Sequence, residues 1–293
     1  MKNFTGCFTA IITPFKKNGD FDEKNFEKII EYQIKNNIDG LIILGTTGES
    51  PTISPEEHDY IIESATKIVN KRTKVIAGTG SNSTQEAIER SKHAEKAGVD
   101  GLLLVSPYYN KPTQKGLYEH FAAIANSVEI PIILYNIQGR CGINIETQTL
   151  LELAKIKNIV GVKEASHDLN QIFEVINNVP KDFVVLSGND DQNFAITKMG
   201  GDGAISVLSN ILPAETKKIV DLSLEKNFDQ AQKEHDKLLP LALSCFVETN
   251  PQPIKTLMAN FEFCEEIFRL PMTTMMPENR KKLLDIWRNI QIG

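Results

Sequence analysis

Short apolar runs alternate with longer amphipathic segments along most of this chain. Eight runs are typical of buried β-strands, namely residues 7–14, 41–45, 75–80, 101–106, 132–136, 159–163, 184–188 and 204–208. The segments between them have the periodicity and capping residues of helices, as in PEEHDYIIESATKIV at 55–69 and TQEAIERSKHAEKAG at 84–98. Strands that are apolar throughout are buried on both faces, which is typical of parallel sheets with helical crossovers.

Eight strand-helix units predict an α/β fold, a closed (β/α)8 TIM barrel over residues 1–226. A doubly wound open sheet is the alternative, but the GxGxxG sequence that usually accompanies such a sheet is missing. At 293 residues and 41% hydrophobic composition, the chain can bury a core of this size. Strand patterns end near residue 226, and residues 227–293 are expected to form a C-terminal helical region packed on the barrel.

Charge and composition exclude several classes of function. A net charge of -6 argues against a nucleic-acid partner, because binding phosphates needs a basic face. No apolar run approaches the roughly 20 residues of a membrane span. The histidines show no HExxH or close His/Cys spacing, so a protein-bound metal is not expected. Absence of a secretory signal, and of CxxC pairs, predicts a cytoplasmic protein whose cysteines are thiols, namely Cys7, Cys141, Cys245 and Cys264.

In barrels of this kind, functional groups lie at the carboxyl ends of the strands and in the loops that follow. Five predicted strands end in polar or glycine-rich segments: GTTGES at 45–50, SPYYNKP at 106–112, LYNIQGRCG at 134–142, VKEAS at 162–166 and SGNDD at 187–191. The site is therefore expected at this end of the barrel.

Lys163 stands in the otherwise apolar strand IVGVKEAS. Strand alternation places it on the face opposite Val160 and Val162, so that it points into the barrel if the valines face the helices. Burial there favours the neutral amine, which attacks carbonyl carbons to form Schiff bases. An ion pair with Glu164, or a position at an exposed strand end, would also account for a single lysine.

Three other strand ends offer complementary groups. Thr46 and Thr47 supply hydroxyls and backbone N–H groups suited to a small carboxylate. Tyr135 ends the strand beside that of Lys163 and is a candidate acid/base group. Arg140 has a planar fork suited to a second carboxylate. Each alone has an ordinary explanation, as a turn residue, core filler or surface cation, but their occurrence together favours a site.

Seven segments together carry a resemblance to a known family: GTTGES, PYYNKPTQKGLYEHF, YNIQGRCG, VGVKEAS, LSGNDD, GAISVLSN and FVETNPQPIK. They resemble the 4-hydroxy-tetrahydrodipicolinate (dihydrodipicolinate) synthases, of the N-acetylneuraminate lyase superfamily, from about Phe4 to Met275. The resemblance implies a lyase of the class I aldolase type in lysine (diaminopimelate) biosynthesis. It would condense pyruvate with L-aspartate 4-semialdehyde through a Schiff base, with no cofactor.

The same resemblance implies a role for each site residue. Lys163 would be the nucleophile, Thr46 and Thr47 would hold the pyruvate carboxylate, and Arg140 would receive the semialdehyde carboxylate. The implied proton relay joins Tyr135, Thr46 and Tyr109, the last reaching across a dimer interface within a homotetramer. Pocket-lining positions are Gly188 and Ile205. In lysine-inhibited relatives the effector binds at positions that correspond to Ser50, His58, Asn82, Glu86 and Tyr108.

Two alternative functions and three departures from the family's usual sequence accompany this resemblance. Related lyases act on N-acetylneuraminate or 2-keto-3-deoxy-sugar acids, but Arg140 favours a small dicarboxylic product. A non-catalytic ligand-binding barrel would need the pocket without the nucleophile. Where the family often reads YNVPGRTG and NPIPVK, this chain has Gln138, Cys141 and Gln252, which puts the geometry of the arginine loop in question.

Overall fold

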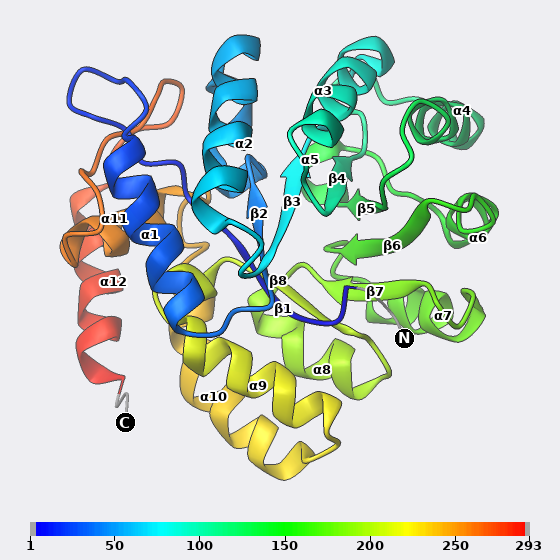
Figure 1. Ribbon diagram of the computed structural model, residues 1–293. Coiled ribbons are helices and arrows are strands. Elements are labelled where there is room, and N and C mark those ends of the chain that lie inside the picture. Colours follow the sequence, from blue (N-terminus) through cyan, green and yellow to red (C-terminus); the bar gives the residue numbers. More distant parts are fainter. Residues whose placement is uncertain (1–3, 291–293) are drawn as a thin grey trace.

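A computed structural model of residues 4–290 shows a closed barrel of eight parallel strands in sequential order (Figure 1). The predicted barrel is confirmed, and the open sheet is excluded because β1 pairs with both β2 and β8. The strands are β1 Gly6–Ala10, β2 Gly40–Ile43, β3 Lys74–Gly78, β4 Gly101–Val105, β5 Ile132–Asn136, β6 Ile159–Glu164, β7 Val184–Ser187 and β8 Gly203–Ser206.

Helices surround these strands on the outside of the barrel (Figure 1). The α-helices are α1 Glu23–Lys35, α2 Pro55–Val69, α3 Thr84–Lys96, α4 Gln114–Ala125, α5 Gln138–Cys141, α6 Thr147–Leu153, α7 Leu169–Asn178, α8 Asn193–Lys198, α9 Pro213–Leu224, α10 Phe228–Ser244, α11 Gln252–Asn260 and α12 Pro277–Asn289. Short 3-10 turns follow three strands: η1 Thr46–Gly48, η2 Ser50–Thr52, η3 Asp190–Gln192 and η4 Leu208–Asn210. None of these helices combines the length and apolar character that crossing a bilayer requires.

Several predicted strands extend too far at their carboxyl ends. The first was expected to reach residue 14, but β1 ends at Ala10. Beyond it, the Ile12 N–H donates to the Asn210 side-chain oxygen at 3.0 Å, and the Asn210 amide donates to the Ala10 carbonyl at 2.8 Å. A side chain from 200 residues away thus replaces the neighbouring strand as hydrogen-bond partner, which apolar patterning along the chain does not reveal.

The core has two layers, one inside the barrel and one between the strands and the helices. Val162 belongs to the outer layer, as predicted, and its neighbour Lys163 points inward toward the Tyr135 ring. The prediction for Val160 is wrong, because this side chain packs against the inner layer while Ile159 belongs to the outer one. A register shift between β5 and β6 leaves Val160 without a partner and interrupts the alternation there.

Helices α10 to α12 follow the barrel in the chain and pack on its outer surface (Figure 1). Helix α10 contacts α9, and the segment after α11 reaches α1, where the Phe263 ring lies 4.7 Å from that of Tyr32. The Lys28 ammonium donates to the Glu262 carbonyl at 2.6 Å beside it. Residues 250 and 255 also reach the loop that follows β2, where they contact Thr47 and Glu49.

Candidate active site

Lys163 is buried near the carboxyl end of β6, beside Tyr135 of β5 in the sheet register. Its ammonium nitrogen lies 4.2 Å from the centroid of the Tyr135 ring. Burial lowers the pKa of Lys163 to about 7. The negative charge of Asp190 acts to raise this pKa, and the positive charge of Arg140 acts to lower it. A large fraction of this amine is therefore unprotonated at neutral pH, which is the state a nucleophile needs.

Gly188 leaves room for this side chain. A Cβ atom at Gly188 would lie 2.9 Å from Cε of Lys163 and 2.8 Å from Cβ of Ala165, closer than such atoms approach. Ile205 of β8 is fully buried in the same inner layer as Tyr135. A larger residue at position 188 would displace the lysine side chain, so the glycine at this position allows Lys163 to lie where it does.

The turn after β2 carries Thr46 and Thr47. Thr47 is buried, and its hydroxyl oxygen accepts a hydrogen bond from the Asn250 side-chain amide at 3.0 Å. The turn lies close to β3, because a Cβ at Gly78 would come within 2.3 Å of the Leu44 carbonyl oxygen. Only a glycine at position 78 permits this approach, which brings the threonines toward the interior of the barrel.

A cavity of about 500 Å³ opens above this region and is lined by Thr46, Tyr135 and Arg140, among others. Lys163 does not line the cavity itself, but its amine lies against the ring of Tyr135, which does line the cavity. Burial raises the pKa of Tyr135 to about 12, although Arg140 and Thr46 both act to lower it. The phenol is therefore protonated at neutral pH and can donate a proton.

Arg140 lies in the short helix α5 at the mouth of the cavity, where it is exposed. Its guanidinium donates to the Asn250 carbonyl at 3.0 Å, which orients the fork. Of the positions that depart from the family pattern, Cys141 is buried and donates to the Ser106 carbonyl at 3.3 Å. Gln138 is exposed at the start of α5.

Tyr109 stands apart from the other predicted residues. Its side chain is 89% exposed, and its backbone has a φ of 72°, a left-handed conformation that is uncommon for an aromatic residue. Its neighbour Tyr108 instead lines the cavity. Within one chain, Tyr109 is therefore not brought to Tyr135 and Thr46.

The five positions of the predicted effector site are only partly together. Ser50, Glu86 and Tyr108 line the same cavity as Tyr135. The Glu86 carboxylate already pairs with Arg90 at 2.5 Å, one helical turn along α3, and also accepts from Ser81. The two remaining positions do not line this cavity: the buried His58 ring nitrogen is 3.0 Å from the Gly78 carbonyl, and the Asn82 carbonyl accepts from Asn110 at 2.9 Å.

Two functional groups at the site were not predicted from the sequence. Asp190 is buried and accepts hydrogen bonds from the Val207 and Leu208 N–H groups at 2.9 and 2.8 Å, while its charge opposes the lowering of the Lys163 pKa. Asn250 contacts both Thr47 and Arg140. Both lie in motifs that carry the family resemblance, SGNDD and FVETNPQPIK, but spacing alone gave them no role.

Glu164, next to the lysine on β6, is fully buried, and its Oε1 atom has no hydrogen-bond partner among residues 4–290. Burial raises its pKa from 4.5 to about 7, so the folded state loses stability as pH rises from 4.5 through 7. Glu164→Gln is therefore expected to add about 2–3 kcal/mol to the free energy of unfolding at about pH 8, and almost nothing near pH 4.5.

Urea denaturation at about pH 5 and pH 8 measures this difference. Glu119→Gln on the exposed face of α4 is the control and should change stability by less than about 0.5 kcal/mol at both values. An equal gain for Glu164→Gln at the two pH values would show that its carboxylate does not titrate with the raised pKa.

Residues 4–290 contain no group of three or more His, Cys, Asp or Glu side chains arranged to hold a metal ion. The four cysteines, named above, are buried and unpaired.

Comparisons with known proteins identify the family of this chain. The 4-hydroxy-tetrahydrodipicolinate synthase of Syntrophus aciditrophicus is 50% identical over 286 residues, which cover 98% of each chain. The crystal structure of dihydrodipicolinate synthase from Aquifex aeolicus has a TM-score of 0.96 at 43% identity, covering 99% of this chain and 100% of that one. A lysine-bound structure from Cyanidioschyzon merolae has a TM-score of 0.96 at 35% identity, covering 98% of each chain. The model of the Dihydrodipicolinate synthetase family matches residues 3–290, and the chain belongs to that family.

Proposed function

We propose that this chain is a lyase that condenses pyruvate with L-aspartate 4-semialdehyde to give 4-hydroxy-tetrahydrodipicolinate, in the lysine (diaminopimelate) pathway. The observation that carries the proposal is the buried Lys163 amine, whose pKa of about 7 suits it to attack a 2-oxo acid at neutral pH. Close similarity to named synthases over almost the whole chain supports the choice of substrates.

The neutral Lys163 amine attacks the pyruvate carbonyl carbon, and the adduct takes up a proton and loses water, which leaves a protonated imine. This iminium draws electrons from the methyl group, which releases a proton and becomes a nucleophilic enamine. The enamine carbon then bonds to the aldehyde carbon of the second substrate, whose oxygen takes up a proton. The amino group of this substrate finally replaces the Lys163 nitrogen at the imine carbon, which closes the ring and releases the lysine. Tyr135 is the proton carrier, because its protonated phenol lies against the lysine and lines the cavity.

The two carboxylates are held by different groups in this scheme. Thr46 and Thr47 bind the carboxylate of pyruvate with their hydroxyls and backbone N–H groups, and Gly188 and Ile205 border the bound pyruvate. Arg140 binds the carboxylate of the semialdehyde at the exposed mouth, where the Asn250 carbonyl orients it. A polyhydroxylated sugar acid would leave this guanidinium without an anionic partner.

The assembly is part of the proposal. Tyr109 completes the proton relay by entering the cavity of a second copy, in a homotetramer built from tight dimers. Its high exposure and left-handed backbone support this role, since they hold the side chain away from its own barrel, where a second copy could receive it. The location proposed for the tetramer is the cytoplasm, where the four cysteines remain thiols.

A coupled initial-rate assay separates the synthase from the related lyases. Purified enzyme supplied with pyruvate and aspartate semialdehyde should consume both at equal rates. N-acetylneuraminate, offered alone, should release no pyruvate. Release of pyruvate from the sugar acid, without consumption of the semialdehyde, would assign the chain to the lyases instead.

The pH dependence of imine formation follows from the Lys163 pKa. Because only the neutral amine attacks, the rate of borohydride-trapped pyruvate adduct should rise about tenfold per unit below pH 7 and level off above about pH 8. A lysine with the ordinary pKa of 10.5 would give a rate still rising at pH 9. Quantifying the adduct by mass spectrometry at short reaction times distinguishes these two profiles.

The cavity also supports inhibition by L-lysine. Glu86 lines this cavity together with Ser50 and Tyr108, and its carboxylate would accept the effector's ammonium in place of its present ion pair with Arg90. His58 and Asn82 complete the proposed effector site from its periphery. L-lysine at millimolar concentration is therefore expected to lower the initial rate, and Glu86→Gln should abolish this response while the uninhibited rate persists. A wild-type rate that does not respond to L-lysine would remove the proposal.

A further inference from the structure

The turn that carries Thr46 and Thr47 has an unusual backbone on both sides. Leu44 and Glu49, which bracket the threonines, both adopt left-handed conformations with a φ of 55°. Residues other than glycine rarely adopt this conformation, and it persists only where the surrounding structure holds it in place. The conformation of the turn must therefore be maintained by contacts from elsewhere in the fold.

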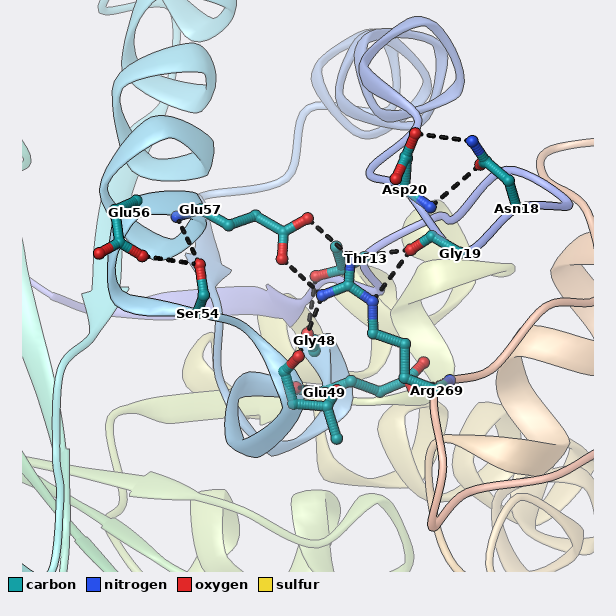
Figure 2. Close-up of polar contacts among 11 residues, drawn as sticks. Thr13, Asn18, Gly19, Asp20, Gly48, Glu49, Ser54, Glu56, Glu57 and Arg269 are labelled. Atoms are coloured by element: carbon teal, nitrogen blue, oxygen red, sulfur yellow. Dashed lines mark hydrogen bonds and ion pairs between the residues drawn. The ribbon is translucent and has the colours of Figure 1, made fainter.

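Glu49 receives those contacts from the C-terminal part of the chain. Its side chain is 1% exposed, and its Oε1 atom pairs with the ammonium of Lys255 on α11. Its Oε2 atom accepts the backbone N–H of Arg269 at 3.2 Å. Figure 2 shows Glu49 pointing toward the Arg269 segment, away from the start of α2. Both carboxylate oxygens are thus held by residues more than 200 positions away in the chain.

Lys255 has no access to solvent. Its side chain is fully buried, with the ammonium 4.3 Å from the centroid of the Phe15 ring and 5.1 Å from that of Phe268. The same nitrogen donates to the Ile267 carbonyl at 3.1 Å. Burying such a pair is a poor way to gain stability, because apolar residues of similar volume often serve as well or better. Its orienting effect on the turn is the more economical explanation.

A second ion pair joins the same two parts of the chain at a different point. The Arg269 guanidinium pairs with Glu57 at the start of α2 and donates to the Gly19 carbonyl, as Figure 2 shows. It also donates to the Thr52 carbonyl at 3.0 Å. This pair is about one-fifth exposed and joins the Arg269 guanidinium to the helix start, whereas Glu49 is held by the Arg269 backbone N–H. It provides a matched comparison for the buried pair.

We propose that Glu49 and Lys255 are positioning residues for the carboxylate-binding turn. They hold Thr46 and Thr47 in the geometry that receives pyruvate, and neither lines the cavity itself. The inference rests on the proposed function, since it assigns the turn to the pyruvate carboxylate. Its consequence is that breaking the pair weakens pyruvate binding by a route separate from its effect on folding.

Two variants separate positioning from stability. Lys255→Met leaves the Glu49 carboxylate buried without a cation, so both the thermal midpoint and pyruvate affinity should fall. Glu49→Gln combined with Lys255→Met removes both charges, so the thermal midpoint should recover most of its loss. The readouts are the unfolding midpoint and the pyruvate concentration that gives half-maximal borohydride trapping on Lys163.

The double variant is expected to need about tenfold more pyruvate for half-maximal trapping, although its midpoint has recovered. A half-maximal concentration within about twofold of wild type would overturn the proposal, because the pair would then serve stability alone. Glu57→Gln should leave the pyruvate dependence unchanged. Should the double variant not fold, Glu49→Gln alone is the test. It is expected to need about fivefold more pyruvate for half-maximal trapping, and an unchanged concentration would overturn the proposal.

The wild-type protein in the same assay keeps the two claims distinguishable. If it forms no pyruvate adduct on Lys163, the proposed function fails. If it forms the adduct and the double variant matches its pyruvate dependence at the recovered midpoint, only the positioning role of Glu49 and Lys255 fails.

Discussion

Lys163→Arg is expected to lower the rate of condensation by at least ~10⁴-fold, because it removes the group that forms the covalent intermediate. An arginine side chain is always positively charged, because its guanidinium cannot be deprotonated in proteins, and so it cannot attack a carbonyl carbon. The same substitution should also remove the borohydride-trapped pyruvate adduct. Steady-state rates with both substrates measure the loss.

Lys217→Arg is the control for this substitution. Lys217 is a half-buried lysine whose ammonium pairs with Asp39 and Asp221, away from the cavity. Arginine can keep both ion pairs, so the rate should remain near that of wild type. Thermal unfolding of both variants shows whether each is folded. A folded Lys163→Arg protein that retained full activity would contradict the covalent mechanism.

Tyr135→Phe is expected to slow turnover by ~10²- to 10⁴-fold, the usual contribution of one positioned acid/base group. The substitution removes only the hydroxyl, so the ring that lies 4.2 Å from the Lys163 amine remains. Imine formation should therefore still be trapped, while the proton transfers that follow become slow. Comparing the steady-state rate with the yield of adduct at long times separates the two effects.

Tyr32→Phe is a matched control, since the Tyr32 hydroxyl also makes a hydrogen bond, to the Ile211 carbonyl at 2.9 Å, but lies outside the cavity. Its removal should cost about 1 kcal/mol of stability and leave the rate unchanged. A Tyr135→Phe enzyme that ran at the wild-type rate would exclude the phenol as the proton carrier.

The interior position of Lys163 was predictable because alternation along one strand and the order of parallel strands are both local properties of the sequence. The same reasoning placed Tyr135 beside it, as the β5–β6 register confirms. Alternation failed at Val160, where a register shift breaks the period. A shift of this kind depends on the neighbouring strand and has no signature within the strand itself.

Contacts between distant segments were not predictable from one sequence. Asn250 meets Thr47, and Lys255 meets Glu49, over separations of more than 200 residues. Neither spacing nor composition indicates such pairs, because they depend on how α11 packs against the loop after β2. By contrast, the Arg90 that neutralises Glu86 lies four residues along the same helix, a spacing at which side chains commonly meet.

The most direct test of the covalent mechanism is to incubate the wild-type enzyme with pyruvate and borohydride and to map the modified peptide by mass spectrometry. A reduced pyruvyl group on the peptide that contains Lys163, and on no other lysine, is the predicted result. An unmodified protein, or modification of a different lysine, would contradict the account.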